Sequence, residues 1–219
     1  NNIPWEEYME VKDTLAIDAT VHSEKFTHSK YIAQKTKDAI VDRFRDKFGE
    51  RPYVDLDFPT LRINVHFEND YCNLSFDSSV QSLHKRVYKT ATNIAPINEV
   101  LAAGLLLLSG WDGQCDFLDP MCGSGTILIE AAMIASNIPP NLNRKEFAFE
   151  KWKDWDVDLF EKIEESVLKK VRDFHFTITG YDTAPSAVNK AIDNVENANL
   201  ADFISIEQLD FFESEKVRE

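Results

Sequence analysis

The front of the chain alternates between apolar and polar positions in a way that predicts strands around one helix. Residues 15–21 and 61–67 each place an apolar side chain at every second position, which is typical of half-buried strands. Residues 72–76 alternate again after a predicted turn at 68–70. Between the strands, side chains spaced four apart predict an amphipathic helix over 29–48, and they are Ile32, Thr36, Ile40, Phe44 and Phe48.

From residue 98 onward, strands and helices alternate. The helix predicted over 98–109 is apolar nearly all round, so we expect it to be buried on most sides. The later elements predict βαβ units and a parallel sheet: strands at 117–118, 174–181 and 203–209, with helices at 126–136 and 185–198. A long insertion, 138–173, interrupts this pattern and carries a further amphipathic helix. The fold class is therefore α/β throughout.

The charge is distributed unevenly. The chain carries a net charge of −14, with −2 on residues 1–90 and −12 on residues 91–219. This acid excess argues against nucleic-acid binding by the second half, whereas the nearly neutral first half leaves room for a local basic face. One basic cluster lies between the halves, and we take it as the candidate nucleic-acid contact: Lys85, Arg86 and Lys89.

Cysteine, histidine and hydropathy patterns exclude several classes of protein. Three cysteines without CxxC spacing, and five scattered histidines, argue against a disulfide framework and a zinc site. No apolar run approaches the roughly 20 residues of a membrane span. We therefore expect a cytoplasmic, monomeric chain with reduced thiols, no metal and no membrane association.

The motif that says most about a ligand is a glycine turn between the strand at 117–118 and the following helix. Glycine lets the backbone approach a ligand closely, and the helix amino terminus adds free N–H groups. A dinucleotide fingerprint needs a third glycine, but Leu128 stands there, and an acid at the start of the turn would repel a pyrophosphate. That acid suits the positively charged amino end of S-adenosylmethionine (SAM). The candidate cofactor contacts here are Asp119, Pro120, Met121, Gly123, Ser124 and Gly125.

A wider resemblance appears in four stretches: SLHKRVYK at 82–89, IAPINEVLAA at 94–103, DPMCGSGTILIEAA at 119–132 and IPPNLNR at 138–144. Together they resemble the bacterial THUMP-domain class I RNA methyltransferases, close to the 23S rRNA guanine-N2 enzymes and often labelled N6-adenine-specific DNA methylases. The resemblance implies a partial THUMP-like α/β domain over 1–80, a linker over 81–97 and the first part of a Rossmann-like methyltransferase domain over 98–219.

The resemblance also implies further cofactor contacts. Asp182 would accept from the ribose hydroxyls, and Asp210 from the adenine amino group, with Phe211 against the adenine ring. Ala95 and Pro96 would flank the methionine end, although Pro96 also fits a plain helix start. Two further positions, Glu130 and Cys122, are ambiguous: Glu130 faces the cofactor or is an ordinary helix acid, and Cys122 has no partner base for nucleophilic chemistry.

One expected motif is missing. Amine methyltransferases of this kind carry an Asn/Asp-Pro-Pro-Tyr/Phe tetrapeptide that holds the target amine, and these 219 residues contain none. We therefore expect an internal fragment whose catalytic residues are unassigned, because the motif would lie beyond Glu219. Such a fragment would hold the cofactor but be nearly inactive alone.

The expected reaction is methylation of guanine N2 in 23S rRNA. Two alternatives stay open at this point. One is DNA adenine-N6 methylation, since the motif at 119–126 also occurs in such enzymes. The other is a non-catalytic RNA-binding module with a degenerate cofactor fold.

Overall fold

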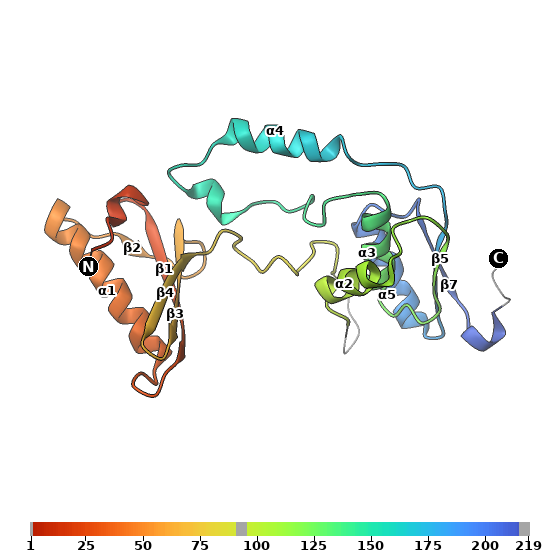
Figure 1. Ribbon diagram of the computed structural model, residues 1–219, viewed down its shortest axis with the longest axis horizontal. Helices are drawn as coiled ribbons and strands as arrows, with labels where there is room; N and C mark the ends of the chain where they lie inside the picture. Colours follow the sequence, from red (N-terminus) through yellow and green to blue (C-terminus); the bar gives the residue numbers. More distant parts are fainter. Residues whose placement is uncertain (1, 91–95, 215–219) are drawn as a thin grey trace. The chain divides into compact units, whose positions relative to one another are not determined.

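The computed structural model describes residues 2–90 and 96–214, and the chain divides into two compact units (Figure 1). The first unit comprises residues 1–80 and 145–158, and the second comprises residues 81–144 and 159–219. Residues 145–158 come from the expected insertion, yet they pack with the first unit. The basic stretch 81–90 packs with the second unit.

The first unit contains a four-stranded mixed sheet in the order β2-β1-β3-β4. The central strand β1 (Thr14–His22) pairs in parallel with β2 (Tyr53–Val54) and with β3 (Leu61–Glu68). A turn at Asn69, with φ of 52°, leads from β3 into the antiparallel strand β4 (Tyr71–Phe76). The strand β2 was not predicted, because two residues are too short to show a periodicity.

One long helix covers the sheet of the first unit. Helix α1 (Ser29–Phe48) has the predicted bounds and ends at Gly49, which adopts a left-handed φ of 76° and donates its N–H to the Arg45 carbonyl. The apolar stripe of α1 packs against β1 and β3, and a short 3-10 helix, η1 (Trp5–Glu7), adds Trp5 to the same core. From the insertion, η2 (Ala148–Lys151) leads to Trp152, which also packs against this core.

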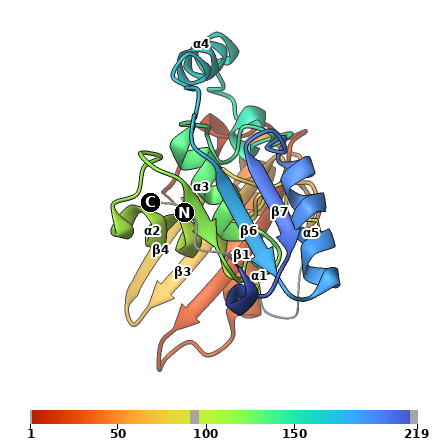
Figure 2. The same ribbon diagram turned by 90° about the vertical axis from the view of Figure 1, so that its right-hand side faces the viewer.

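The second unit contains the predicted parallel sheet, whose three described strands lie in the order β5-β6-β7. Strand β5 (Phe117–Asp119) pairs with β6 (Ile178–Asp182), and β6 pairs with β7 (Ile204–Gln208). Figure 2 shows α3 (Thr126–Ala135) behind the sheet, with α2 (Glu99–Ser109) on one side of it and α5 (Pro185–Asn197) beside β7 on the other. The sheet and α3 form the centre of this unit's core.

Helix α2 is less buried than the sequence predicted. Its bounds match the prediction, and Asn98 caps it by accepting the N–H groups of Val100 and Leu101. Only Glu99, Ala102 and Leu106 of this helix are buried, whereas five apolar side chains are about half or more exposed: Val100, Leu101, Leu105, Leu107 and Leu108. The expectation was wrong because β5 is an edge strand of the described sheet, so α2 packs mainly against α3.

The remaining helix of the insertion is α4 (Val157–Leu168), which has no buried residue. It is amphipathic, as the pattern predicted, but it ends before Val171. Within residues 2–90 and 96–214, no helix combines the length and apolarity that a membrane crossing requires.

Candidate cofactor-binding site

Three carboxylates lie at the carboxyl end of the parallel sheet in the second unit. Asp119 is the last residue of β5 and Asp182 is the last residue of β6, while Asp210 follows β7 by two residues. Because parallel strands end at the same edge, the structure gathers these three predicted acids on one side of the sheet. This edge is where open α/β sheets bind their ligands.

The glycine turn between β5 and α3 is fixed by backbone conformation and by hydrogen bonds to β6. Gly123 has φ of 57° and Gly125 has φ of 79°, a region that favours glycine over residues with a Cβ atom. The Cys122 N–H donates to the Tyr181 carbonyl (2.8 Å), and the Gly123 N–H donates to Asp182 Oδ2 (3.0 Å). Asp182 therefore also anchors the turn, a role that the sequence did not reveal.

The two downstream acids each hold the backbone that follows them. Asp182 Oδ1 accepts the Ala184 N–H (2.9 Å), and Asp210 Oδ1 accepts the Phe212 N–H (2.9 Å). A carboxylate offers about four lone-pair sites, so both acids keep acceptor capacity for a ligand. Phe211 begins the 3-10 helix η3 (Phe211–Glu213) and is 47% exposed, which leaves its ring open to contact.

The electrostatic environment of the turn favours a positively charged ligand. Burial, together with the nearby charge of Asp182, raises the pKa of Asp119, although the Met121 N–H (3.1 Å) partly opposes this shift. Burial and the charges of Asp119 and Asp182 raise the pKa of the Cys122 thiol to about 12. Cys122 is therefore protonated at neutral pH and unsuited to act as a nucleophile.

The other predicted contacts around the turn differ in exposure. Pro120 is half-buried and Met121 is 77% exposed, whereas Ser124 is buried. Pro96 is exposed just before α2.

Two of the sequence predictions fall on residues that the structure does not describe. Ala95, predicted to flank the methionine end of the cofactor, lies outside the described residues. So does Glu219. No catalytic residue is assigned within residues 2–90 and 96–214.

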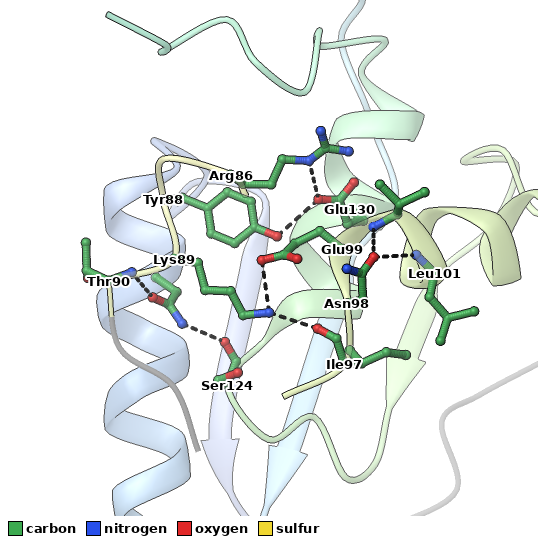
Figure 3. Close-up of polar contacts among 12 residues, drawn as sticks. Arg86, Tyr88, Lys89, Thr90, Ile97, Asn98, Glu99, Leu101, Ser124 and Glu130 are labelled. Carbon is green, nitrogen blue, oxygen red and sulfur yellow. Dashed lines mark hydrogen bonds and ion pairs between the residues drawn. The ribbon is translucent and has the colours of Figure 1, made fainter. Parts of the chain in front are cut away.

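The basic cluster occupies a different environment from the one expected for RNA contact. Lys85 is exposed, but the side chains of Arg86 and Lys89 are only 7% and 8% exposed. Arg86 Nε pairs with Glu130 Oε1 (3.2 Å), and Lys89 Nζ pairs with Glu99 Oε1 (3.1 Å) (Figure 3). These placements are at odds with RNA contact by Arg86 and Lys89, because each charge is already neutralised inside the unit.

The same contacts assign Glu130, which the sequence left open. Its side chain is buried and accepts from Arg86 and from the Tyr88 hydroxyl (3.1 Å). Burial, then the charge of Glu130, raises the pKa of Tyr88 far above its ordinary value, so the phenol stays protonated and donates. Sequence reasoning missed Tyr88, and it also missed Asn194, a fully buried residue on α5. A polar residue within the apolar stripe of α5 was the available signal.

Family models match both units. The model of the RMKL-like methyltransferase domain matches residues 86–218, and the model of the THUMP domain matches residues 1–77. The ribosomal RNA large subunit methyltransferase K/L of Syntrophotalea carbinolica is 38% identical over 206 residues, which is 90% of this chain and 29% of that protein. This chain thus spans less than a third of that relative.

Solved structures agree over nearly the whole chain. SMU.472, described as a methyltransferase and solved in complex with S-adenosylhomocysteine (SAH), matches with a TM-score of 0.89 and 30% identity, over 99% of this chain and 58% of that one. A Listeria monocytogenes protein described as a predicted N6-adenine-specific DNA methylase matches with a TM-score of 0.86 and 30% identity, over 97% of this chain and 56% of that one.

These matches confirm the expected order of a THUMP-like α/β domain followed by a Rossmann-like methyltransferase domain. The strand–turn–helix arrangement around Asp119 and Gly125 lies inside the segment that the methyltransferase model matches. The chain therefore belongs to the RMKL-like methyltransferase family and carries a THUMP domain ahead of its methyltransferase domain.

Proposed function

We propose that this chain binds SAM at the carboxyl ends of β5, β6 and β7 and serves methyl transfer to an exocyclic amine of RNA, guanine N2 of 23S rRNA. The observation that carries the proposal is the glycine turn next to Asp119 and Asp182, with Asp210 at the same edge of the sheet. The chain would hold the cofactor, whose chemical contribution is a methyl group activated by a sulfonium charge.

The donor set of the site fits this cofactor better than a dinucleotide. SAM carries two positive charges, on its sulfonium and its α-amino group, and burial next to Asp182 already makes a lone Asp119 carboxylate unfavourable. A cation beside these acids would relieve that electrostatic strain. A pyrophosphate would add negative charge to it, and Met121, Gly123 and Ser124 offer no basic side chain to compensate.

Each acid matches a different part of the cofactor. Asp119, inside the turn region, would accept from the amino group of the methionine moiety. Asp182, whose two oxygens each hold one backbone N–H, keeps lone pairs for the ribose hydroxyls. Asp210 would accept from the adenine amino group, and the open ring of Phe211 would lie against the adenine. Pro96 precedes α2 and would lie near the methionine end.

An RNA substrate is favoured over DNA by the first unit. Its residues match the THUMP model, and the curated relative is named for large-subunit ribosomal RNA. The description of the Listeria neighbour as a DNA methylase keeps adenine N6 of DNA as the second candidate. A non-catalytic RNA-binding module is the third, and it predicts that the cofactor site is dispensable.

In the first unit, we propose a groove as a surface for RNA contact; Lys85, in the second unit, is a separate proposed contact. The groove has a volume of about 1000 Å³. Its walls carry three acids, Glu6, Glu10 and Glu50, beside a larger set of basic and aromatic side chains: Lys12, Lys37, Phe48, Arg51, Tyr53 and Lys153. Tyr53 is 78% exposed, so its ring is available to stack on an unpaired base. Lys12 and Lys37 make ion pairs with neighbouring acids, but exposed pairs of this kind are weak enough to exchange for phosphates.

Deleting the gene that encodes this chain tests the proposed reaction in its native setting. We expect one N2-methylguanine to disappear from 23S rRNA, detected by mass-spectrometric mapping, while N6-methyladenine in DNA is unchanged. The wild-type gene should restore the modification, and a gene carrying Asp182→Ala should not. Loss of DNA N6-methyladenine instead would support the second candidate. Unchanged RNA and DNA methylation would contradict an enzymatic role.

A further inference from the structure

A buried polar network joins the segment 86–90 to three helices of the second unit (Figure 3). At one end, Arg86 and Tyr88 both bond to Glu130 of α3. In the middle, Lys89 Nζ contacts Glu99 Oε1 (3.1 Å) and donates to the Ile97 carbonyl (2.8 Å). The Lys89 contacts therefore tie the segment to the start of α2 and to the residue next to Pro96.

Asn194 extends this network to the glycine turn. Its side chain is fully buried on α5, where its Oδ1 accepts the Thr90 N–H (3.2 Å) and its Nδ2 donates to the Ser124 carbonyl (3.0 Å). Asn197, one turn further along α5, donates to the Thr90 hydroxyl (2.8 Å). The approach to α2 is thus bonded directly to the segment 86–90, and the turn after β5 is linked to the same segment through Asn194.

The chemistry of these contacts points to positioning rather than to bulk stability. Burying a lysine and a glutamate carries a large desolvation penalty, and apolar residues of similar size stabilise a fold equally well or better. Hydrogen bonds, unlike apolar contacts, fix the direction and distance of the groups they join. Lys89 and Asn194 apply such bonds to two backbone carbonyls, those of Ile97 and Ser124, which lie in the two segments proposed to border the cofactor.

We propose that Lys89, Glu99 and Asn194 are positioning residues for the cofactor. They set the placement of Ile97 relative to the glycine turn at Ser124, without touching the ligand themselves. This inference rests on the proposed function, because it assumes that SAM binds beside the turn. It assigns Lys89 to the cofactor site rather than to RNA.

The test removes the buried ion pair while keeping the chain folded, by replacing both residues with apolar side chains of similar size. In the 219-residue chain, the double variant Lys89→Met/Glu99→Leu should keep its melting temperature within a few degrees of wild type. Calorimetric titration should show SAM affinity lowered about tenfold, equivalent to about 1.4 kcal/mol. A folded double variant with wild-type affinity would overturn the inference.

Two further variants address two other causes of weaker binding, a general loss of stability and a failure of the double variant to fold. Ile204→Val removes a methylene from the same unit's core, so it should lower the melting temperature and leave SAM affinity unchanged. A matching loss of affinity in Ile204→Val would show that affinity follows stability alone, and would overturn the inference. If the double variant does not fold, Glu99→Gln replaces it, since this isosteric change removes the charge that holds Lys89 Nζ next to the Ile97 carbonyl. It should still weaken SAM binding severalfold, and wild-type affinity there would also contradict the proposal.

The wild-type titration distinguishes this inference from the function on which it rests. Absence of SAM binding by the wild-type chain would contradict the proposed function and, with it, the inference. Normal binding by the wild type and by every variant would contradict the inference alone. As a direct readout of positioning, SAM should slow amide exchange of Val100 and Ser124 less in the double variant than in the wild type.

Discussion

The carboxylate of Asp119 is the acid of the cofactor site whose pKa is raised by its surroundings. Burial and the Asp182 charge raise its pKa, so it takes up a proton at a higher pH than an ordinary aspartate, whose pKa is about 3.9. A cationic ligand binds the ionised form, and protonation competes with it. SAM affinity should therefore fall as pH drops through the raised pKa. Calorimetry at a series of pH values, from neutral pH down to the ordinary pKa of aspartate, would measure this fall.

The Asp119→Asn variant is the matched control for this pH dependence. It should bind SAM more weakly at neutral pH and show little change over the same range, because the titrating group is gone. A wild-type affinity that is flat over this range would contradict the role given to Asp119.

Gly180 in β6 is a second residue whose identity is dictated by its surroundings. A Cβ atom there would lie 2.3 Å from Leu128 Cδ1 and 3.1 Å from the Cys122 side chain. Gly180→Ala should therefore destabilise the chain by about 1–3 kcal/mol, the usual range for overpacking a core. Chemical denaturation would measure this change in the free energy of unfolding.

Gly104 in α2 supplies the control for Gly180. A Cβ atom at Gly104 meets nothing within 4 Å, and alanine is the better helix former by about 1 kcal/mol. Gly104→Ala should leave stability unchanged or raise it. Equal destabilisation by both substitutions would contradict the packing described around Gly180.

The individual contacts of this site were only partly predictable. Asp119, Gly123 and Gly125 were identifiable because their chemistry is local to one turn. The partners of Arg86 were not, since Glu130 lies 44 residues away in the sequence and a pattern of charges does not show which of them fold inward. The bond between Asp182 and the Gly123 N–H was not predictable for the same reason, since 59 residues separate the two in the sequence.

At the scale of elements, α2 shows the clearest difference from its sequence pattern. Leu106 is 4% exposed, while Leu108 on the same helix is 87% exposed. Leu106→Ala should lower the free energy of unfolding by about 2–5 kcal/mol. Leu108→Lys should change it by no more than about 0.5 kcal/mol, because it removes no buried contact. Urea titration of both variants would show whether this face of α2 is exposed in solution.

Helix and strand bounds were predictable where a stop signal or a long periodic stretch exists. The bounds of α1 follow from its apolar stripe and from Gly49, whose left-handed conformation ends the helix. Strand β6 starts at Ile178, later than the aromatic run from Phe174 suggested. The rings of Phe174 and Trp111 pack together before the strand begins, so the hydrophobicity there serves the core rather than the sheet.

At the scale of the whole chain, the proposed RNA partner has to be reconciled with a net charge of −14. Lys85 is exposed, whereas the side chain of its neighbour Arg86 is buried. We therefore expect replacement of Lys85 to affect RNA binding and replacement of Arg86 to affect stability. Lys85→Ala should weaken RNA binding and reduce its salt dependence, with no change in melting temperature. Arg86→Ala should destabilise the chain by about 3–5 kcal/mol, because it leaves the buried Glu130 without its counter-ion. Binding assays at several salt concentrations, with thermal unfolding, would separate the two effects.

The function proposed for this chain depends on cofactor binding at the carboxyl ends of β5, β6 and β7, and calorimetric titration of the 219-residue chain with SAM tests this binding most directly. We expect one SAM bound per chain, no binding of NAD, and loss of SAM binding in Asp182→Ala, which removes both a ribose acceptor and the anchor of Gly123. A chain that binds NAD instead of SAM, or an Asp182→Ala variant with wild-type SAM affinity, would contradict the account.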